Sequence, residues 1–168
     1  MKKALVLSLL LPVIFGCAHL QEKPVLPGHI KSLVVPIFVN RSTRFGLEEE
    51  VANQIINEFI LDGRLLIAPE REANSKIEGE IISYHKEPLS YNEQGYTLEY
   101  KIWIQTGLKF IDLQKQKMLW EDEEEGAATY VPENIATQGL STETEEEALD
   151  RAILDLAQKV VSRTIEGW

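Results

Sequence analysis

Cys17 is the residue of this chain whose chemistry most needs an explanation. It is the only cysteine, so it cannot form an intrachain disulfide, and cysteine-based zinc sites are excluded. It follows Gly16 at the end of an apolar run, Ala4–Phe15, which is interrupted only by Ser8 and preceded by Lys2 and Lys3. A basic start, a short apolar stretch and a small residue before the cleavage point are typical of a secretory signal. A single cysteine in an exported chain then calls for a specific role.

The Gly16-Cys17 junction resembles the end of a bacterial lipoprotein signal. This resemblance implies that residues 1–16 are a signal peptide, that cleavage occurs before Cys17, and that Cys17 carries the lipid, with palmitate among its acyl chains. Residues 17–29 would be the lipidated N-terminus and a short tether. Residues 30–168 would form one α+β domain.

The same stretch admits three other interpretations. A membrane-spanning helix needs ~20 apolar residues to cross the hydrocarbon, and Ala4–Phe15 spans only twelve residues. An ordinary secretory signal cut after Ala18 would use Gly16 and Ala18 as its small residues. Cys17 could also be a buried structural thiol. The lipoprotein interpretation is preferred because it explains both the signal and the single cysteine.

The charge of the chain restricts its partners. The formal net charge of −10 becomes −12 when removal of residues 1–16 takes away Lys2 and Lys3 and no acid. Nucleic acids favour basic surfaces, so nucleic acid is excluded as a general partner. Attachment to a membrane would come from the lipid on Cys17 rather than from bulk charge.

The sequence offers no recognisable catalytic or metal-binding pattern. The histidines His19, His29 and His85 are far apart, and the acidic run 121–125 lacks the alternating ligands and glycine turn of a calcium loop. A phosphate loop, a dinucleotide fingerprint and a Gly-x-Ser-x-Gly elbow are also missing from the sequence. We therefore expect no enzyme activity, no cofactor and no metal.

Hydrophobic periodicity predicts the elements that position the remaining residues. Short strands are expected at 32–38 and 65–68, with a helix between them that starts at Leu47 and ends at Asp62-Gly63. A third strand is expected at 76–87, and a fifth begins at 118–121.

The segment 98–110 alternates apolar and polar residues, which indicates one long strand with a dry face and a wet face. Thr144 and Glu147 match a capping box at the start of a final helix. The order strand, helix, four strands, helix predicts an α+β fold. In it, two helices pack on one face of a mainly antiparallel sheet of four to five strands.

Taken in order, several short stretches resemble the LPS-assembly lipoprotein family, LptE. No single stretch is specific, but the ordered set runs through nearly the whole mature chain. The stretches are 26–31, 34–41, 47–50, 62–64, Tyr84 with 87–91, 119–121, 145–148, 153–157 and 166–168.

The resemblance implies a location and a role. Family members lie at the periplasmic face of the outer membrane, insert into the lumen of the β-barrel LptD, and help it fold and place lipopolysaccharide in the outer leaflet. An LptD-type barrel is therefore the expected partner, with lipopolysaccharide as a second candidate ligand. The alternative function is a lipoprotein subunit of a secretion pore of the curli-export type, which would form ring-shaped oligomers.

Five residues are candidates for contact with the barrel or with lipopolysaccharide. Arg41 and Arg44 flank a polar loop after the first strand, and each could also be an ordinary solvated charge. Lys101 and Lys109 lie on the wet face of the long strand, where solubilising charges are common. Trp103 lies on the same face, where it could anchor an interface or pack beneath a loop.

Overall fold

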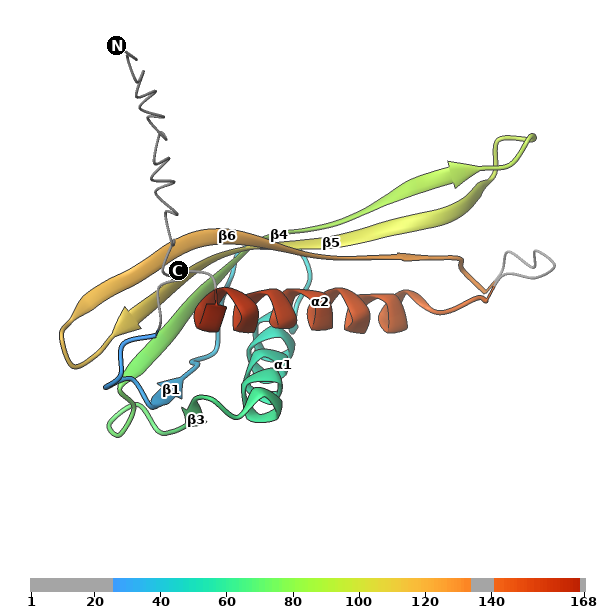
Figure 1. Ribbon diagram of the computed structural model, residues 1–168. Helices are drawn as coiled ribbons and strands as arrows, with labels where there is room; N and C mark the ends of the chain where they lie inside the picture. The colour runs from blue at the N-terminus through green and yellow to red at the C-terminus, as the bar shows by residue number, and fades with distance from the viewer. Residues whose placement is uncertain (1–25, 134–140, 167–168) are drawn as a thin grey trace, which may run out of the picture.

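The computed structural model describes residues 26–133 and 141–166 (Figure 1). Cys17 and the predicted signal peptide lie outside these residues. The described elements, in chain order, are β1 (Ser32–Val34), β2 (Val39–Asn40), α1 (Leu47–Asp62), β3 (Leu66–Ile67), β4 (Ser75–Tyr91), β5 (Thr97–Asp112), β6 (Lys117–Tyr130) and α2 (Glu145–Glu166).

The predicted α+β class is confirmed, but the sheet is mixed and has more strands than predicted. The order across it is β3-β1-β4-β5-β6, with β2 also paired to β4. The pairs that β4 forms with β1 and β2 are parallel, whereas the long pairs β4–β5 and β5–β6 are antiparallel. The predicted first strand, 32–38, is shortened to β1, which ends before Pro36, a residue with no N–H to donate to a ladder, and the extra strand β2 begins just after the predicted end.

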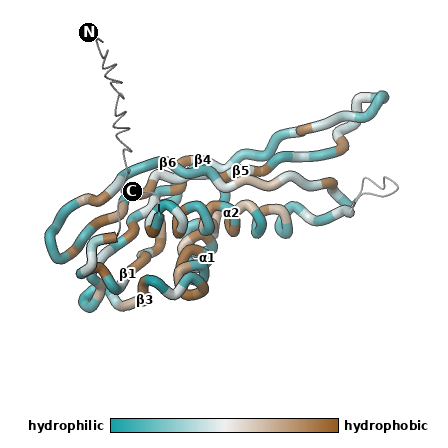
Figure 2. The backbone as a smooth tube through the Cα atoms, viewed as in Figure 1, coloured by the Kyte–Doolittle hydropathy of each residue, from teal (hydrophilic) through white to brown (hydrophobic). Residues whose placement is uncertain are grey.

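Both helices lie against the same face of the sheet (Figure 1). Along β5, Ile102, Ile104, Leu108 and Phe110 are fully buried on that face, and they pack with apolar side chains of α1 and α2. Figure 2 shows hydrophobic stretches in both helices and in the strands above them. The predicted dry face of the long strand therefore forms the sheet side of the hydrophobic core.

Two glycines allow close packing on this face. A Cβ on Gly126 of β6 would lie 2.2 Å from the carbonyl oxygen of Ala152, so only glycine lets α2 approach so closely. A Cβ on Gly79 of β4 would lie 2.1 Å from the ring of Phe38, which occupies the space above it. At both positions, any residue larger than glycine would clash with the group packed against it.

The helix ends follow the predicted capping signals. Gly63 adopts a left-handed conformation (φ 73°) after α1, and its N–H donates to Phe59. At the start of α2, the N–H of Glu147 donates to Thr144 Oγ1 at 3.2 Å. The Glu147 carboxylate accepts from the Thr144 N–H at 2.8 Å. This reciprocal pair is a capping box.

The β4–β5 hairpin extends beyond the rest of the sheet (Figure 1). β4 and β5 pair as far as Tyr91 and Thr97, whereas β6 pairs with β5 only as far as Tyr100. Residues 88–99 thus form a two-stranded projection, called the arm from here on. Its turn is held by Asn92 Oδ1, which accepts from the N–H groups of Gln94 and Tyr96 at 3.0 and 2.8 Å.

Candidate interaction surface

The face of β4, β5 and β6 that points away from the helices is called the open face. Trp103, at the middle of β5, lies on it, and its ring stacks on that of His85 from β4 with centroids 4.9 Å apart. The amino group of Lys101 lies 4.9 Å from the centre of the Trp103 ring, close enough for a cation–π contact. Trp103 is therefore half-buried among polar neighbours and does not belong to the helix-side core.

Acidic residues of β6 neutralise the lysines of this face. Lys101 pairs with Glu125 at 3.3 Å and Lys109 pairs with Glu121 at 3.0 Å. Glu123 accepts a hydrogen bond from the Gln105 amide at 2.8 Å. The run 121–125 is thus part of a strand whose odd-numbered acids line the open face.

Within residues 26–133 and 141–166, no three His, Asp, Glu or Cys side chains are arranged to hold a metal ion.

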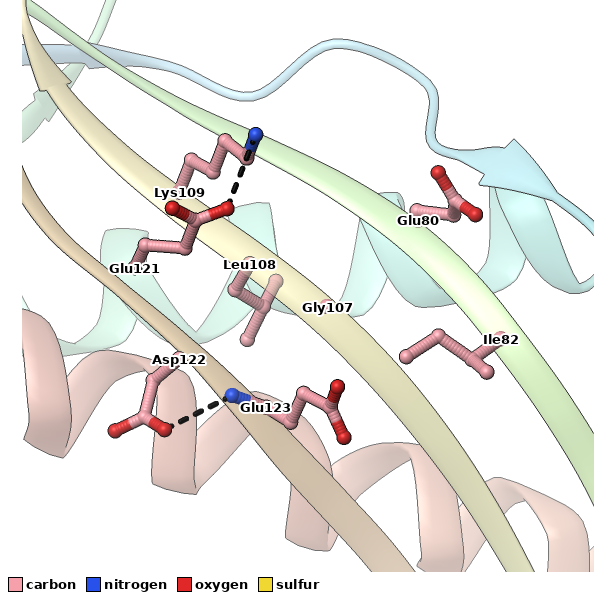
Figure 3. Close-up of a pocket in the computed structure, with 8 residues that line it drawn as sticks. All are labelled: Glu80, Ile82, Gly107, Leu108, Lys109, Glu121, Asp122 and Glu123. Carbon is pink, nitrogen blue, oxygen red and sulfur yellow. Dashed lines mark hydrogen bonds and ion pairs between the residues drawn. The ribbon is translucent and has the colours of Figure 1, made fainter.

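A shallow hollow lies on the open face (Figure 3). Gly107 forms its floor because it has no side chain, and Ile82, 3.6 Å from an added Cβ there, flanks it. Ile82 is the extra residue of a bulge in β4, because the pairing with β5 shifts between Ile81 and Ser83. The Lys109–Glu121 ion pair and Glu123 line the opposite side. The hollow can receive a side chain of a partner, but its lining carries no catalytic arrangement.

The loop that carries Arg41 and Arg44 is tightly hydrogen-bonded. The Asn40 amide donates to the Arg44 carbonyl at 2.8 Å and to Glu48 at 2.7 Å, and its oxygen accepts from the Ser42 N–H at 2.9 Å. Arg41 pairs with Glu80 on β4. The structure thus places the two arginines in different surroundings.

Arg44 reaches the N-terminus of α2, where its guanidinium donates to Glu146 at 2.6 Å. This hydrogen bond raises the pKa of Arg44. The next residue, Phe45, is 96% exposed, and the sequence analysis did not identify it. A rigid loop that presents a fully exposed aromatic ring is a further candidate contact point.

A charged cluster joins the base of the arm to α2. Glu145, at the start of α2, accepts from Lys86 Nζ at 2.6 Å and from the Tyr84 hydroxyl at 2.8 Å. The hydrogen bond from Lys86 lowers the pKa of Glu145, and the same bond raises the pKa of Lys86. Burial, followed by the bond to Glu145, raises the pKa of Tyr84 to about 12. These contacts fix the direction in which the arm leaves the body.

The far part of the arm exposes apolar side chains. Leu89, Tyr91 and Tyr96 are 50%, 58% and 72% exposed. The sequence analysis ended the third strand at residue 87, began the next at residue 98, and did not select these residues as contact candidates. The alternation of Tyr96, Leu98 and Tyr100, which continues the apolar row of β5, is the signal that could have identified them.

The described residues thus form an α+β body with a paired polar face, an exposed loop and a projecting arm, which is the architecture of an interaction module. The chain matches the model of the LptE family, described as lipopolysaccharide-assembly, over residues 30–164. The chain therefore belongs to the LptE family, whose members are non-enzymatic lipoproteins of lipopolysaccharide assembly. A search of curated proteins finds no match.

Solved structures share this fold at low sequence identity. A hypothetical protein from Chlamydia trachomatis is similar with a TM-score of 0.58 and 11% identity, covering 79% of this chain and 95% of its own. A minor lipoprotein from Acinetobacter baumannii gives 0.51 and 16%, covering 84% and 92%. The rare lipoprotein B from Shewanella oneidensis gives 0.50 and 13%, covering 78% and 92%. At such identities the likeness concerns the fold alone.

The described helices give no sign of a membrane span: neither α1 nor α2 is both long and apolar enough to cross a bilayer.

Proposed function

We propose that this protein is anchored through a lipid on Cys17 to the periplasmic face of the outer membrane. There it occupies the lumen of an LptD-type β-barrel, assists its assembly, and so supports the placement of lipopolysaccharide in the outer leaflet. It makes and breaks no bonds itself. The observation that carries the proposal is the family match over residues 30–164, supported by the Gly16-Cys17 junction.

The shape of the sheet supports a role inside a barrel. β4 has 17 residues and β5 has 16, so the hairpin is ~50 Å long at roughly 3.3 Å per residue. Strands of globular domains are usually about a third as long. A long, narrow sheet with a compact body at one end can fill an elongated lumen.

The open face is the proposed contact with the barrel wall. Trp103 supplies an aromatic anchor there, and the paired charges of Lys101 and Lys109 can rearrange onto polar groups of the wall. Arg41 and Arg44 remain candidate contacts. Phe45, which follows Arg44 just before α1, is a more exposed candidate in the same loop. The proposal does not include direct binding of lipopolysaccharide. Each of these cations is already paired with a carboxylate among the described residues and is not free to bind a phosphate.

Purification of the chain from its own outer membrane in mild detergent tests the proposal. We expect an LptD-type barrel to co-purify in a one-to-one complex. Recovery of the chain as a ring of identical subunits without the barrel would contradict the proposal and favour the alternative, a lipoprotein subunit of a secretion pore.

A further inference from the structure

The distribution of unpaired lysines singles out one end of the molecule. Most described Lys and Arg side chains lie within 4 Å of a carboxylate. In the part of the chain that the structure describes, the cations without such a partner are Lys31, Lys115 and Lys117. All three are exposed. This is unexpected in a chain with a formal net charge of −10, because acids are in excess.

Hydrogen bonds bring these lysines to the same end of the sheet. Asn74 accepts from the Lys31 N–H through its side chain at 3.2 Å and from the Leu113 N–H through its carbonyl at 2.9 Å. Leu113 opens the β5–β6 turn, which contains Lys115 and leads into β6 at Lys117. Figure 1 shows this turn and the start of β1 at the end of the sheet opposite the arm.

The acids at this end do not cancel the lysines. Lys76 lies between Glu78 at 2.7 Å and Glu70 at 3.4 Å, and Arg71 pairs with Glu72 at 3.2 Å. One surplus carboxylate therefore faces the three lysines. Asp112 is 1% exposed and accepts from His29 at 2.6 Å. Burial alone would raise the pKa of Asp112, but the N–H of Lys115 and the His29 ring outweigh it and lower the pKa. The exposed charge that remains at this end is positive.

The described chain begins at this same end, with residues 26–29. The His29–Asp112 contact fixes the chain just before β1 to the end of β5. The ten residues from Cys17 to Leu26, joined by nine peptide bonds, span at most ~30 Å when fully extended. A lipid on Cys17 therefore holds the lysine end near the bilayer, whereas the tip of the arm lies a whole strand length away.

We infer that Lys31, Lys115 and Lys117 form a docking surface for the anionic phospholipid headgroups of the leaflet that holds the lipid anchor, so that the arm points away from this leaflet. The inference rests on the proposed attachment through Cys17. Three lysines near an anionic surface are enough to orient a tethered body, although too few to recruit a free one. Met118, which is 49% exposed beside Lys117, adds an apolar contact suited to the headgroup boundary.

The test uses residues 17–168 coupled through the thiol of Cys17, the only cysteine, to a maleimide phospholipid in vesicles. Vesicles of phosphatidylcholine alone are compared with vesicles that also contain phosphatidylglycerol. Lysine amines are acetylated and the rates are read by mass spectrometry. We expect acetylation of Lys31, Lys115 and Lys117 to slow by at least about threefold on the anionic vesicles, with the protection lost at high salt. Lys159, on α2, serves as the internal control.

A second readout follows the arm. Energy transfer from a dye on an unnatural amino acid at position 94 to dyes in the bilayer should fall on the anionic vesicles. The triple variant K31Q, K115Q and K117Q should abolish this change. The triple variant N53D, Q54E and N57D on α1, which alters the net charge equally, should retain it.

Equal acetylation on both kinds of vesicle would overturn the inference, as would protection that appears only when lipopolysaccharide replaces phosphatidylglycerol. Because the lipid is attached chemically and no barrel is present, such a failure would leave the proposed barrel partnership untouched.

Discussion

Asp155 on α2 accepts a hydrogen bond from the backbone N–H of Ala127, an outward-pointing group on the edge of β6, at 3.0 Å. The same helix face provides Arg151, which donates to the Thr129 carbonyl at 2.6 Å, and Lys159, which donates to the Glu125 carbonyl at 2.7 Å. Four helical residues rise ~6.0 Å and two strand residues ~6.8 Å, so the two spacings match. The helix thereby satisfies alternate groups of an edge strand that could otherwise pair with another chain.

Substitution D155A should expose this edge. The variant loses a hydrogen bond to the backbone, which costs about 1 kcal/mol, and the uncovered N–H can donate to a carbonyl of a foreign strand. We expect a lower melting temperature and concentration-dependent self-association in size-exclusion chromatography. D150A, an exposed helix position, is the matched control. If D155A stayed monomeric and as stable as D150A, the edge would be protected by something other than Asp155.

Two glycine substitutions should differ sharply in their effect on stability. G126A places a Cβ 2.5 Å from that of Leu156 and 2.2 Å from the Ala152 carbonyl, which forces α2 away and should cost ~1–3 kcal/mol or more. G107A finds its nearest contact, Ile82, at 3.6 Å and should be tolerated. Urea unfolding of both variants makes the comparison. Equal stability of the two would show that α2 does not pack as closely as described.

Acidification should weaken the junction of arm and body. The hydrogen bond from Lys86 lowers the pKa of Glu145 in the folded state, so this interaction stabilises the protein above the unfolded pKa and is lost as pH falls through the folded pKa. The free energy of unfolding of wild type should exceed that of E145Q at about pH 7, and the difference should shrink toward about pH 3. E49Q, another first-turn carboxylate of a helix, is the control. A difference in the free energy of unfolding that does not change with pH would show that the charge of Glu145 does not contribute to stability.

Trp103 and Ile102 are adjacent on β5 but point to opposite faces. Ile102 is fully buried, so I102A should cost ~2–5 kcal/mol. W103A should weaken capture of the barrel and leave the melting temperature of the free protein much closer to wild type. K101E and K109E, which alter exposed ion pairs, should change stability by only about 0.5 kcal/mol. Melting curves and barrel pull-downs of the same variants are compared. W103A melting as early as I102A would place Trp103 in the core.

Much of the fold could be predicted from signals that act between residues close together in the sequence. The ends of α1 and α2 were predictable because Gly63, Thr144 and Glu147 act within a few residues of their own positions. The dry face of β5 was predictable because apolar and polar residues alternate along the segment, and successive side chains of a strand point to opposite faces of the sheet. The length of β6 was not, because the run 121–125 looks like a solvated acidic segment until its partners Lys101, Lys109 and Arg163 are brought beside it.

The interaction surface was harder to predict than the fold. Trp103 was correctly placed on the wet face, but its stacking on His85 depends on strand pairing across 18 residues of sequence. Phe45 carries no periodic signal because it lies in a loop. The early end of the first strand and the parallel pairing of β1 and β2 with β4 also depend on tertiary contacts, because a proline such as Pro36 by itself indicates only an edge or a bulge.

In-cell photocrosslinking tests the central claim most directly. A benzoylphenylalanine in place of Trp103 lies on the open face, and the same residue in place of Gln158, an exposed position on α2, serves as the comparison. We predict an adduct with the LptD-type barrel from position 103, with the crosslinked peptide mapped to a residue that faces the barrel lumen, and a much weaker adduct from position 158. Adducts from position 103 only to other copies of this chain would contradict the proposed function.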